Sequence, residues 1–273
     1  AWGWHPDGWF VSGWGYHDVA AAGVVHTIAG WFAFGVLLNL GPRIGKYNED
    51  GTANEIEGHS LVSSFIGLLM LIVGFFGFLG ACLIWAGADL GGWVNIYGAP
   101  ATLSSFAFNT LMGLAGGMIG AFWWSKGNPF WMMSGGLAGI FICAGGLDIW
   151  YPGFAFVLGI IAGCVIIPAN NWLHNTFKID DCVGAVSIHG VAGVLGVLAV
   201  GVFAAGYPSA GDIPPTSFVG QLIGCIVMVL TGLVPGYVIS YVMKSMGWLR
   251  VPDEVQAAGI DSAELNLRAY ADK

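Results

Sequence analysis

Charged side chains are scarce in this sequence. Of its 273 residues, 9% are Asp, Glu, Lys or Arg, whereas 56% are hydrophobic. A soluble domain carries about 25% charged residues, so the composition excludes an ordinary soluble domain and indicates a membrane protein. Lys and Arg number only 8 against 16 Asp and Glu, which leaves no basic surface for nucleic acid.

Cysteine is also sparse, and its spacing excludes several kinds of site. The cysteines stand singly, without the spacing of metal ligands, and we expect them to be small core residues. The sequence has no nucleotide-binding loop and no Ser/His/Asp constellation in a polar region. We therefore predict no enzyme activity, no cofactor and no metal site. The five cysteines are Cys82, Cys143, Cys164, Cys182 and Cys225.

Long apolar runs define the fold class. A membrane-spanning helix needs about 20 mostly apolar residues, and seven runs meet that length. The sequence therefore predicts an all-α membrane protein with seven transmembrane helices. The expected spans are 18–41, 60–87, 101–124, 129–148, 153–173, 182–205 and 217–245.

The basic residues predict the orientation of these spans. They follow the first, third and fifth spans or lie at or after the end of the seventh, so with seven spans all eight share one side of the membrane. The positive-inside rule then places the amino terminus outside. We expect a transmembrane domain over 1–246 and a cytoplasmic tail over 247–273. The basic residues are Arg43, Lys46, Lys126, Lys178, Lys244, Arg250, Arg268 and Lys273.

Two histidines lie deep in apolar spans. His26 follows the outer start of the first span by eight residues, and His189 follows the inner start of the sixth by seven. At 1.5 Å per residue both lie near the middle of a hydrocarbon core about 30 Å thick. A polar group there needs a partner or a cavity. The rings either bond to each other or are separate core histidines bonded to backbone carbonyls.

Five segments carry a resemblance that covers nearly the whole chain. They are DVAAAGVVHTIAG (18–30), LGPRIGKY (40–47), EGHS with GFFGFLG (57–60 and 74–80), KIDDCVGAVSIHGVAGVLG (178–196) and LRVPDEVQAAGIDSAELNLRAY (249–270). With them the sequence resembles the ammonium transporters of the Amt/Mep/Rh group. That family has eleven spans in an inverted repeat and forms trimers with one pore per subunit. The seven spans of this chain resemble its fifth to eleventh.

The resemblance implies roles for pore and mouth residues. His26 and His189 resemble the paired histidines of a narrow hydrophobic pore, and Phe78 resembles the inner of two stacked gating phenylalanines. By the same resemblance, ammonium is recruited at an outer mouth, loses a proton and passes on as ammonia.

Three more residues match the outer mouth of the family's pore. Trp4 resembles a tryptophan that holds a cation against its ring face, and Asp18 resembles an acidic residue that supports that site. Cys82 stands where the family often has a serine, so a thiol replaces the hydroxyl that the resemblance would offer to ammonium there. Asp148, at the outer end of the fourth span, is unusual, and we expect an exposed rim position or a salt bridge to another chain.

The family's first four spans have no counterpart here. We expect either a homotrimer or an assembly with a chain that supplies those helices, in a plasma or inner membrane. The tail could receive a cytoplasmic signalling protein. Two other functions stay open: a non-conducting structural or sensory subunit of a membrane complex, and a membrane protein that holds haem between two histidines.

Overall fold

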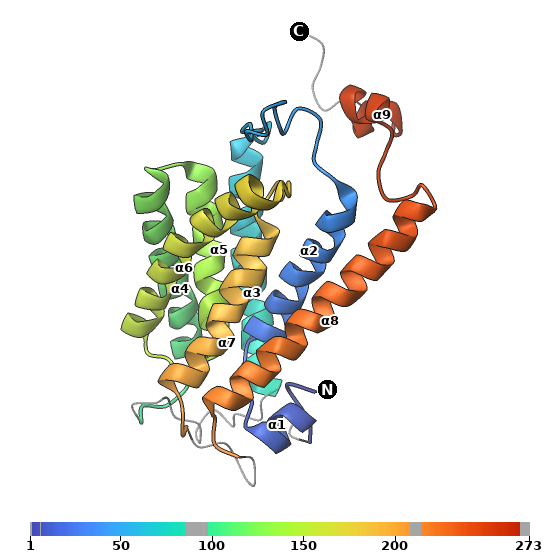
Figure 1. Ribbon diagram of the computed structural model, residues 1–273. Coiled ribbons are helices and arrows are strands. Elements are labelled where there is room, and N and C mark those ends of the chain that lie inside the picture. Colours follow the sequence, from blue (N-terminus) through green and yellow to red (C-terminus); the bar gives the residue numbers. More distant parts are fainter. Residues whose placement is uncertain (1, 6, 86–94, 96–97, 208–213, 268–273) are drawn as a thin grey trace.

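Long apolar helices make up the computed structural model, which describes residues 2–5, 7–85, 95, 98–207 and 214–267 (Figure 1). Among these residues, six helical segments are long and apolar enough to span a membrane. They are η1 and α2 (Ala22–Thr27, Ile28–Leu40), α3 (Leu61–Trp85), α4 (Leu103–Ser125), α6 and η2 (Pro152–Trp172, Leu173–Phe177), η3 and α7 (Val186–Val191, Ala192–Phe203) and α8 (Phe218–Ser245). The chain is thus an integral membrane protein by length and composition.

The fourth expected span, 129–148, differs from the others. Its helix α5 (Pro129–Ala144) has 16 residues and falls short of the usual spanning length. A run of turns follows from Gly145 to Ile149, and those residues are buried. In the second expected span, 60–87, α3 is described to Trp85, and the last two residues lie outside the described part of the chain.

Several helices begin at side-chain caps that the sequence supplies. Thr102 and the side chain of Ser105 form a reciprocal capping box at the start of α4. Asn128 accepts a hydrogen bond from the backbone N–H of Trp131 at the start of α5, and Ser217 does the same for Gly220 at α8. These side chains satisfy amides that a helix start leaves without partners.

Glycine brings the helix backbones close together. A Cβ on Gly117 would collide with the backbone of Gly135, so α4 and α5 touch through their main chains. Gly116 meets the backbone of Phe156 in α6, and Gly236 of α8 meets that of Phe32 in α2. Close packing through small residues is typical of membrane helices, since the hydrophobic effect does not drive their association within lipid.

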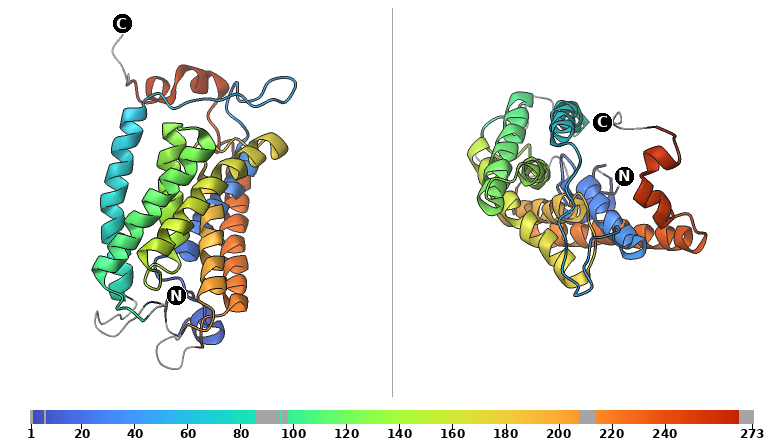
Figure 2. Two further views of the ribbon diagram at one scale, coloured as in Figure 1. Left: turned by 90° about the vertical axis from the view of Figure 1, so that its left-hand side faces the viewer. Right: turned by 90° about the horizontal axis from the view of Figure 1, so that it is seen from above.

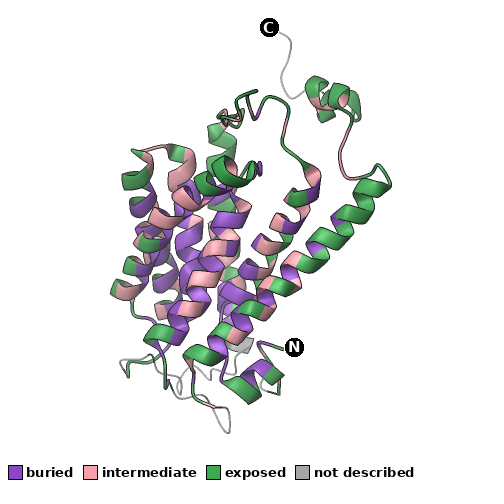
Figure 3. Cartoon of the chain, in the orientation of Figure 1, coloured by how far each residue is buried: buried purple, intermediate pink, exposed green. Residues whose placement is uncertain are grey.

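One helix stands at the edge of the bundle. Helix α3 contacts α4 and α5 but exposes a wide apolar face, including Val62, Met70 and Val73 (Figures 2 and 3). Its Gly67 and Gly74 have open space where a side chain would be. This face has the chemistry of a surface that meets lipid or another apolar helix.

The two ends of the bundle carry different short helices. The short helix α1 (Trp9–Trp14) lies at the end that carries the amino terminus, and α9 and α10 (Asp253–Ala258, Ile260–Ala263) lie at the other (Figure 1).

Of the five cysteines, three are buried and Cys164 is half-buried, whereas Cys182 is exposed. The expectation of a core position is therefore wrong for Cys182.

Candidate functional site

The first histidine lies on a short π-helical turn that an aspartate caps. Asp18 is buried, and its Oδ2 accepts hydrogen bonds from the amides of Gly23 (2.9 Å) and Val24 (3.0 Å). The Tyr16 hydroxyl donates to the same oxygen at 3.2 Å. Both amides belong to the first turn of η1, which carries His26 eight residues after the aspartate.

The second histidine has the same local arrangement on a different helix. Asp181 accepts from the amides of Ala185 (2.9 Å, at Oδ1) and Val186 (2.7 Å, at Oδ2). The turn η3 follows, and His189 lies eight residues after the aspartate. The spacing from Asp181 to His189 thus repeats that from Asp18 to His26. The sequence analysis missed this repeat, although the spacing was readable.

The structure brings His26 and His189 into direct contact. Their Nδ1 atoms lie 3.1 Å apart, so one imidazole donates its Nδ1–H to the other. The ring centroids are 5.3 Å apart and the planes meet at 33°. His26 is 3% exposed, and its Nε2 is buried without a hydrogen-bond partner. That nitrogen remains available to a small ligand.

A phenylalanine that the sequence analysis did not select covers both imidazoles. Phe141 of α5 stacks on His26, with centroids 3.7 Å apart and planes at 21°. It also stacks on His189 at 4.5 Å and 28°. Phe75 of α3 meets the edge of Phe141 at 5.6 Å. Phe78, which the sequence analysis selected, is half-buried and packs against the core of the bundle.

Of the remaining predicted residues, Trp4 contacts Asp18. The indole Nε1–H of Trp4 donates to the backbone carbonyl of Asp18 at 2.6 Å, and Trp4 is half-buried against the core. Cys82 is buried near the end of the described part of α3. Trp4 is thus tied to the turn that begins at the capping aspartate of the first histidine.

Asp148 is buried and pairs with a histidine of its own chain, so the expectation of an exposed rim position is wrong. Its carboxylate Oδ1 lies 3.0 Å from His17 Nε2, and the Asp148 side chain is fully buried. The side-chain amide of Gln221 donates to the backbone carbonyl of His17 at 2.7 Å, and its carbonyl accepts from the His17 N–H at 2.9 Å. Burial lowers the pKa of His17, but the charge and hydrogen bond of Asp148 outweigh burial and raise it above its usual value.

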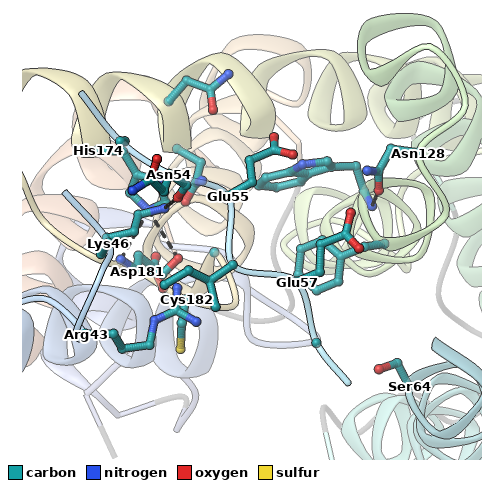
Figure 4. A pocket seen from close by; sticks show the side chains of 18 of the residues that line it. Arg43, Lys46, Asn54, Glu55, Glu57, Ser64, Asn128, His174, Asp181 and Cys182 are labelled. Atoms are coloured by element: carbon teal, nitrogen blue, oxygen red, sulfur yellow. Dashed lines mark hydrogen bonds between the residues drawn. The ribbon is translucent and has the colours of Figure 1, made fainter. Parts of the chain in front are cut away.

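The opposite end of the bundle holds a polar cavity of about 480 Å³ between the 41–60 connection and the segment before η3 (Figure 4). Both charge signs line it, including Arg43, Glu57 and Asp181. Beside it, Arg43 donates to Asp180 from its backbone N (2.9 Å), Nε (2.7 Å) and Nη2 (2.8 Å). Burial opposes ionisation of Asp180, yet these bonds and the guanidinium charge hold the pKa of its carboxyl below the usual value.

This geometry does not fit a haem between the two histidines. Axial ligation would require an iron atom and a flat macrocycle to separate the two ligating nitrogens. The Nδ1 atoms instead lie 3.1 Å apart in a direct hydrogen bond, which leaves no room for a macrocycle between the two rings. In the part of the chain that the structure describes, no three His, Cys, Asp or Glu side chains gather as metal ligands.

Comparison with known proteins identifies the family of this membrane protein. The chain belongs to the ammonium transporter family, whose model, described as "Ammonium Transporter Family", matches residues 1–270. Ammonium transporter Amt1 of Methanocaldococcus jannaschii is 31% identical over 261 residues, which cover 94% of this chain and 62% of that protein. Ammonium transporter Amt1 of Haloferax mediterranei is 32% identical over 265 residues, which cover 94% and 49%.

Solved structures share the fold. The structure described as "Sensor Amt Protein" is 31% identical with a TM-score of 0.78, over 91% of this chain and 60% of that one. Mep2 of Candida albicans is 20% identical with a TM-score of 0.72, over 93% and 56%, and this likeness shows the fold alone. The chain therefore spans less than two thirds of the length of the relatives that it matches.

Proposed function

We propose that this chain forms the histidine-bearing wall of an ammonium transport pathway. The observation that carries the proposal is the contact of His26 with His189, two imidazoles from different helices that meet inside the apolar bundle. A buried polar pair costs free energy unless it serves a ligand or a partner. The free Nε2 of His26 gives a neutral small base such as ammonia a hydrogen-bonding partner at that depth.

The chemistry of the substrate sets the sequence of events. A charged group in the middle of the membrane costs about 3 kcal/mol or more, whereas ammonia is neutral. Ammonium is recruited at the outer mouth, where Trp4 offers a ring face and Asp18 a buried carboxylate, with Cys82 close by. Cation–π attraction contributes roughly 0.5–2 kcal/mol there. The cation gives up its proton to water at the outer mouth, and ammonia passes Phe78 as a lid and then His26 and His189.

The proposal includes an orientation and an assembly. The end of the bundle with Arg43, Lys46 and the polar cavity faces the cytoplasm, in line with the positive-inside rule. Residues 1–246 then form the membrane domain with the amino terminus outside, and 247–273 form a cytoplasmic tail that can receive a signalling protein. Inverted repeats build their pathway between the two halves, so helices of the facing half complete each pore. The assembly is either a homotrimer or a complex with a chain that supplies those helices, in the plasma or inner membrane.

A sensory role is the second candidate. It is favoured by the 31% identity to the solved structure described as "Sensor Amt Protein". A non-conducting subunit would keep the ligand-binding mouth and use its exposed helix faces to join a larger complex. It would bind ammonium without moving it across the bilayer.

Uptake of radiolabelled methylammonium separates the two candidates. The protein is purified with the chains that accompany it and reconstituted into vesicles, and vesicles without protein serve as the control. A transporter gives uptake that excess ammonium suppresses and excess potassium does not. Binding without uptake contradicts transport and supports the sensory candidate. Intact-mass measurement of the same sample identifies any chain that supplies further helices.

A further inference from the structure

Three aromatic rings form one stack in the centre of the bundle. The Phe141 ring lies 3.7 Å from His26 and 4.5 Å from His189, while the imidazole centroids are 5.3 Å apart. The benzene ring therefore contacts both imidazoles. Its plane makes angles of 21° and 28° with theirs, so the three rings are nearly parallel. The three centroids form a triangle, in which the Phe141 ring lies over the face of His26 and is offset from His189.

The packing of helix α5 holds Phe141 in its position. The residue is 1% exposed and lies on α5, whose Gly135 and Gly139 contact the backbone of α4. Helix α5 contacts both η1 and η3, the two turns that carry the histidines. Phe75 lies beside this pair of rings, with its centroid 5.6 Å from that of Phe141 and 6.4 Å from that of His26. These contacts leave the ring little freedom to move away from the imidazoles.

A covered face changes what can reach the histidines. Each Nδ1 is used by the hydrogen bond between the rings, and Phe141 covers one face of His26. The Nε2 edge of His26 has no hydrogen-bond partner. A hydrated cation needs several donors and acceptors around it, and the apolar ring of Phe141 supplies none. A small neutral base needs only one ring nitrogen as its hydrogen-bond partner.

We propose that Phe141 is a positioning residue for this histidine pair and sets its specificity for a small neutral base. The ring holds the two imidazoles at the mutual angle that their Nδ1–Nδ1 bond requires, and it keeps water from one face of His26. The part of the proposal that concerns transport rests on the proposed function. The part that concerns the rings does not.

The test replaces the aromatic ring and reads the histidines directly. Phe141→Leu nearly keeps the side-chain volume but removes the aromatic ring, and Phe141→Ala removes the ring and most of the volume. We expect the nitrogen-15 NMR signature of the Nδ1–Nδ1 hydrogen bond to disappear in both variants, since each aromatic contact shifts a local equilibrium by up to about tenfold. Phe122→Leu, on the exposed face of α4, is the matched control and keeps the signature.

Transport provides the second readout. Phe141→Leu should lower the maximal rate of methylammonium uptake about tenfold, with KM nearly unchanged because the outer mouth is intact. Phe141→Leu with an unchanged hydrogen-bond signature overturns the positioning role, and an unchanged uptake rate overturns the specificity role. A wild-type protein without uptake contradicts the proposed function instead, and the NMR comparison then still decides whether Phe141 positions the histidines.

Discussion

His17 Nε2 lies 3.0 Å from Asp148 Oδ1, and the two residues come from segments 131 positions apart in the sequence. The carboxylate is fully buried and the imidazole is 12% exposed. This pair ties the segment before η1 to the turn after α5. Because the charge and hydrogen bond of Asp148 raise the pKa of His17 despite burial, the pair becomes weaker when the imidazole loses its proton.

The stability of the protein should therefore fall with rising pH through this pair. A histidine whose folded pKa is raised contributes stability that is fully present below its unfolded pKa, about 6.5, and lost as the pH passes the folded pKa. We expect a lower melting temperature at about pH 9 than at about pH 6, and a smaller difference in Asp148→Asn. Tryptophan fluorescence during heating measures both.

The control for this prediction is an exposed pair of the same kind. His5 and Asp7 lie 3.7 Å apart with side chains 53% and 93% exposed, and such pairs contribute about 0–1 kcal/mol. Asp7→Asn should leave the pH dependence as in wild type. If Asp148→Asn behaves like Asp7→Asn, the buried pair does not stabilise the fold.

The approach of the two histidine helices depends on Gly30. A Cβ at this position would collide with the backbone of Gly190, one residue after His189. Gly30→Ala should force the turns apart, lower stability by about 1–3 kcal/mol as overpacking does, and weaken the Nδ1–Nδ1 bond seen by nitrogen-15 NMR. Gly74→Ala, where the added carbon meets open space, should keep that bond. A normal bond in Gly30→Ala would mean that the helices tolerate a wider separation.

The cap at Asp181 should matter for His189. Asp181→Ala removes the acceptor of two amides at the start of η3, and losing an N-cap costs about 0.5–2 kcal/mol. We expect lower thermal stability and reduced methylammonium uptake, whereas Asp181→Asn, which keeps one oxygen, should be milder. Asp261→Ala, in the exposed first turn of α10, is the control. Equal melting temperatures of Asp181→Ala and Asp261→Ala would exclude the cap as a stabilising contact.

The pattern of apolar runs predicted much of the helix layout, because each spanning helix must satisfy its backbone within one segment. The depths of His26 and His189 predicted that the two imidazoles lie at one level. The repeat of Asp18 and His26 by Asp181 and His189 was present in the spacing and could have been found there.

Contacts between distant segments were beyond sequence reasoning. Nothing marks Phe141 among 17 phenylalanines, since its place over both imidazoles depends on how α5 packs against η1 and η3. Asp148 looked like a rim residue because its partner His17 is 131 positions away. The length of α5 was overestimated because the apolar run continues into turns that are buried rather than helical.

The most direct test of the central claim is methylammonium uptake by the reconstituted protein with both imidazoles replaced. We expect His26→Leu with His189→Leu to abolish uptake, because the substitution removes the only nitrogens proposed to receive ammonia inside the bilayer. Binding of ammonium at the outer mouth should persist in that variant, which shows that the protein is folded. Uptake equal to that of wild type would contradict the account.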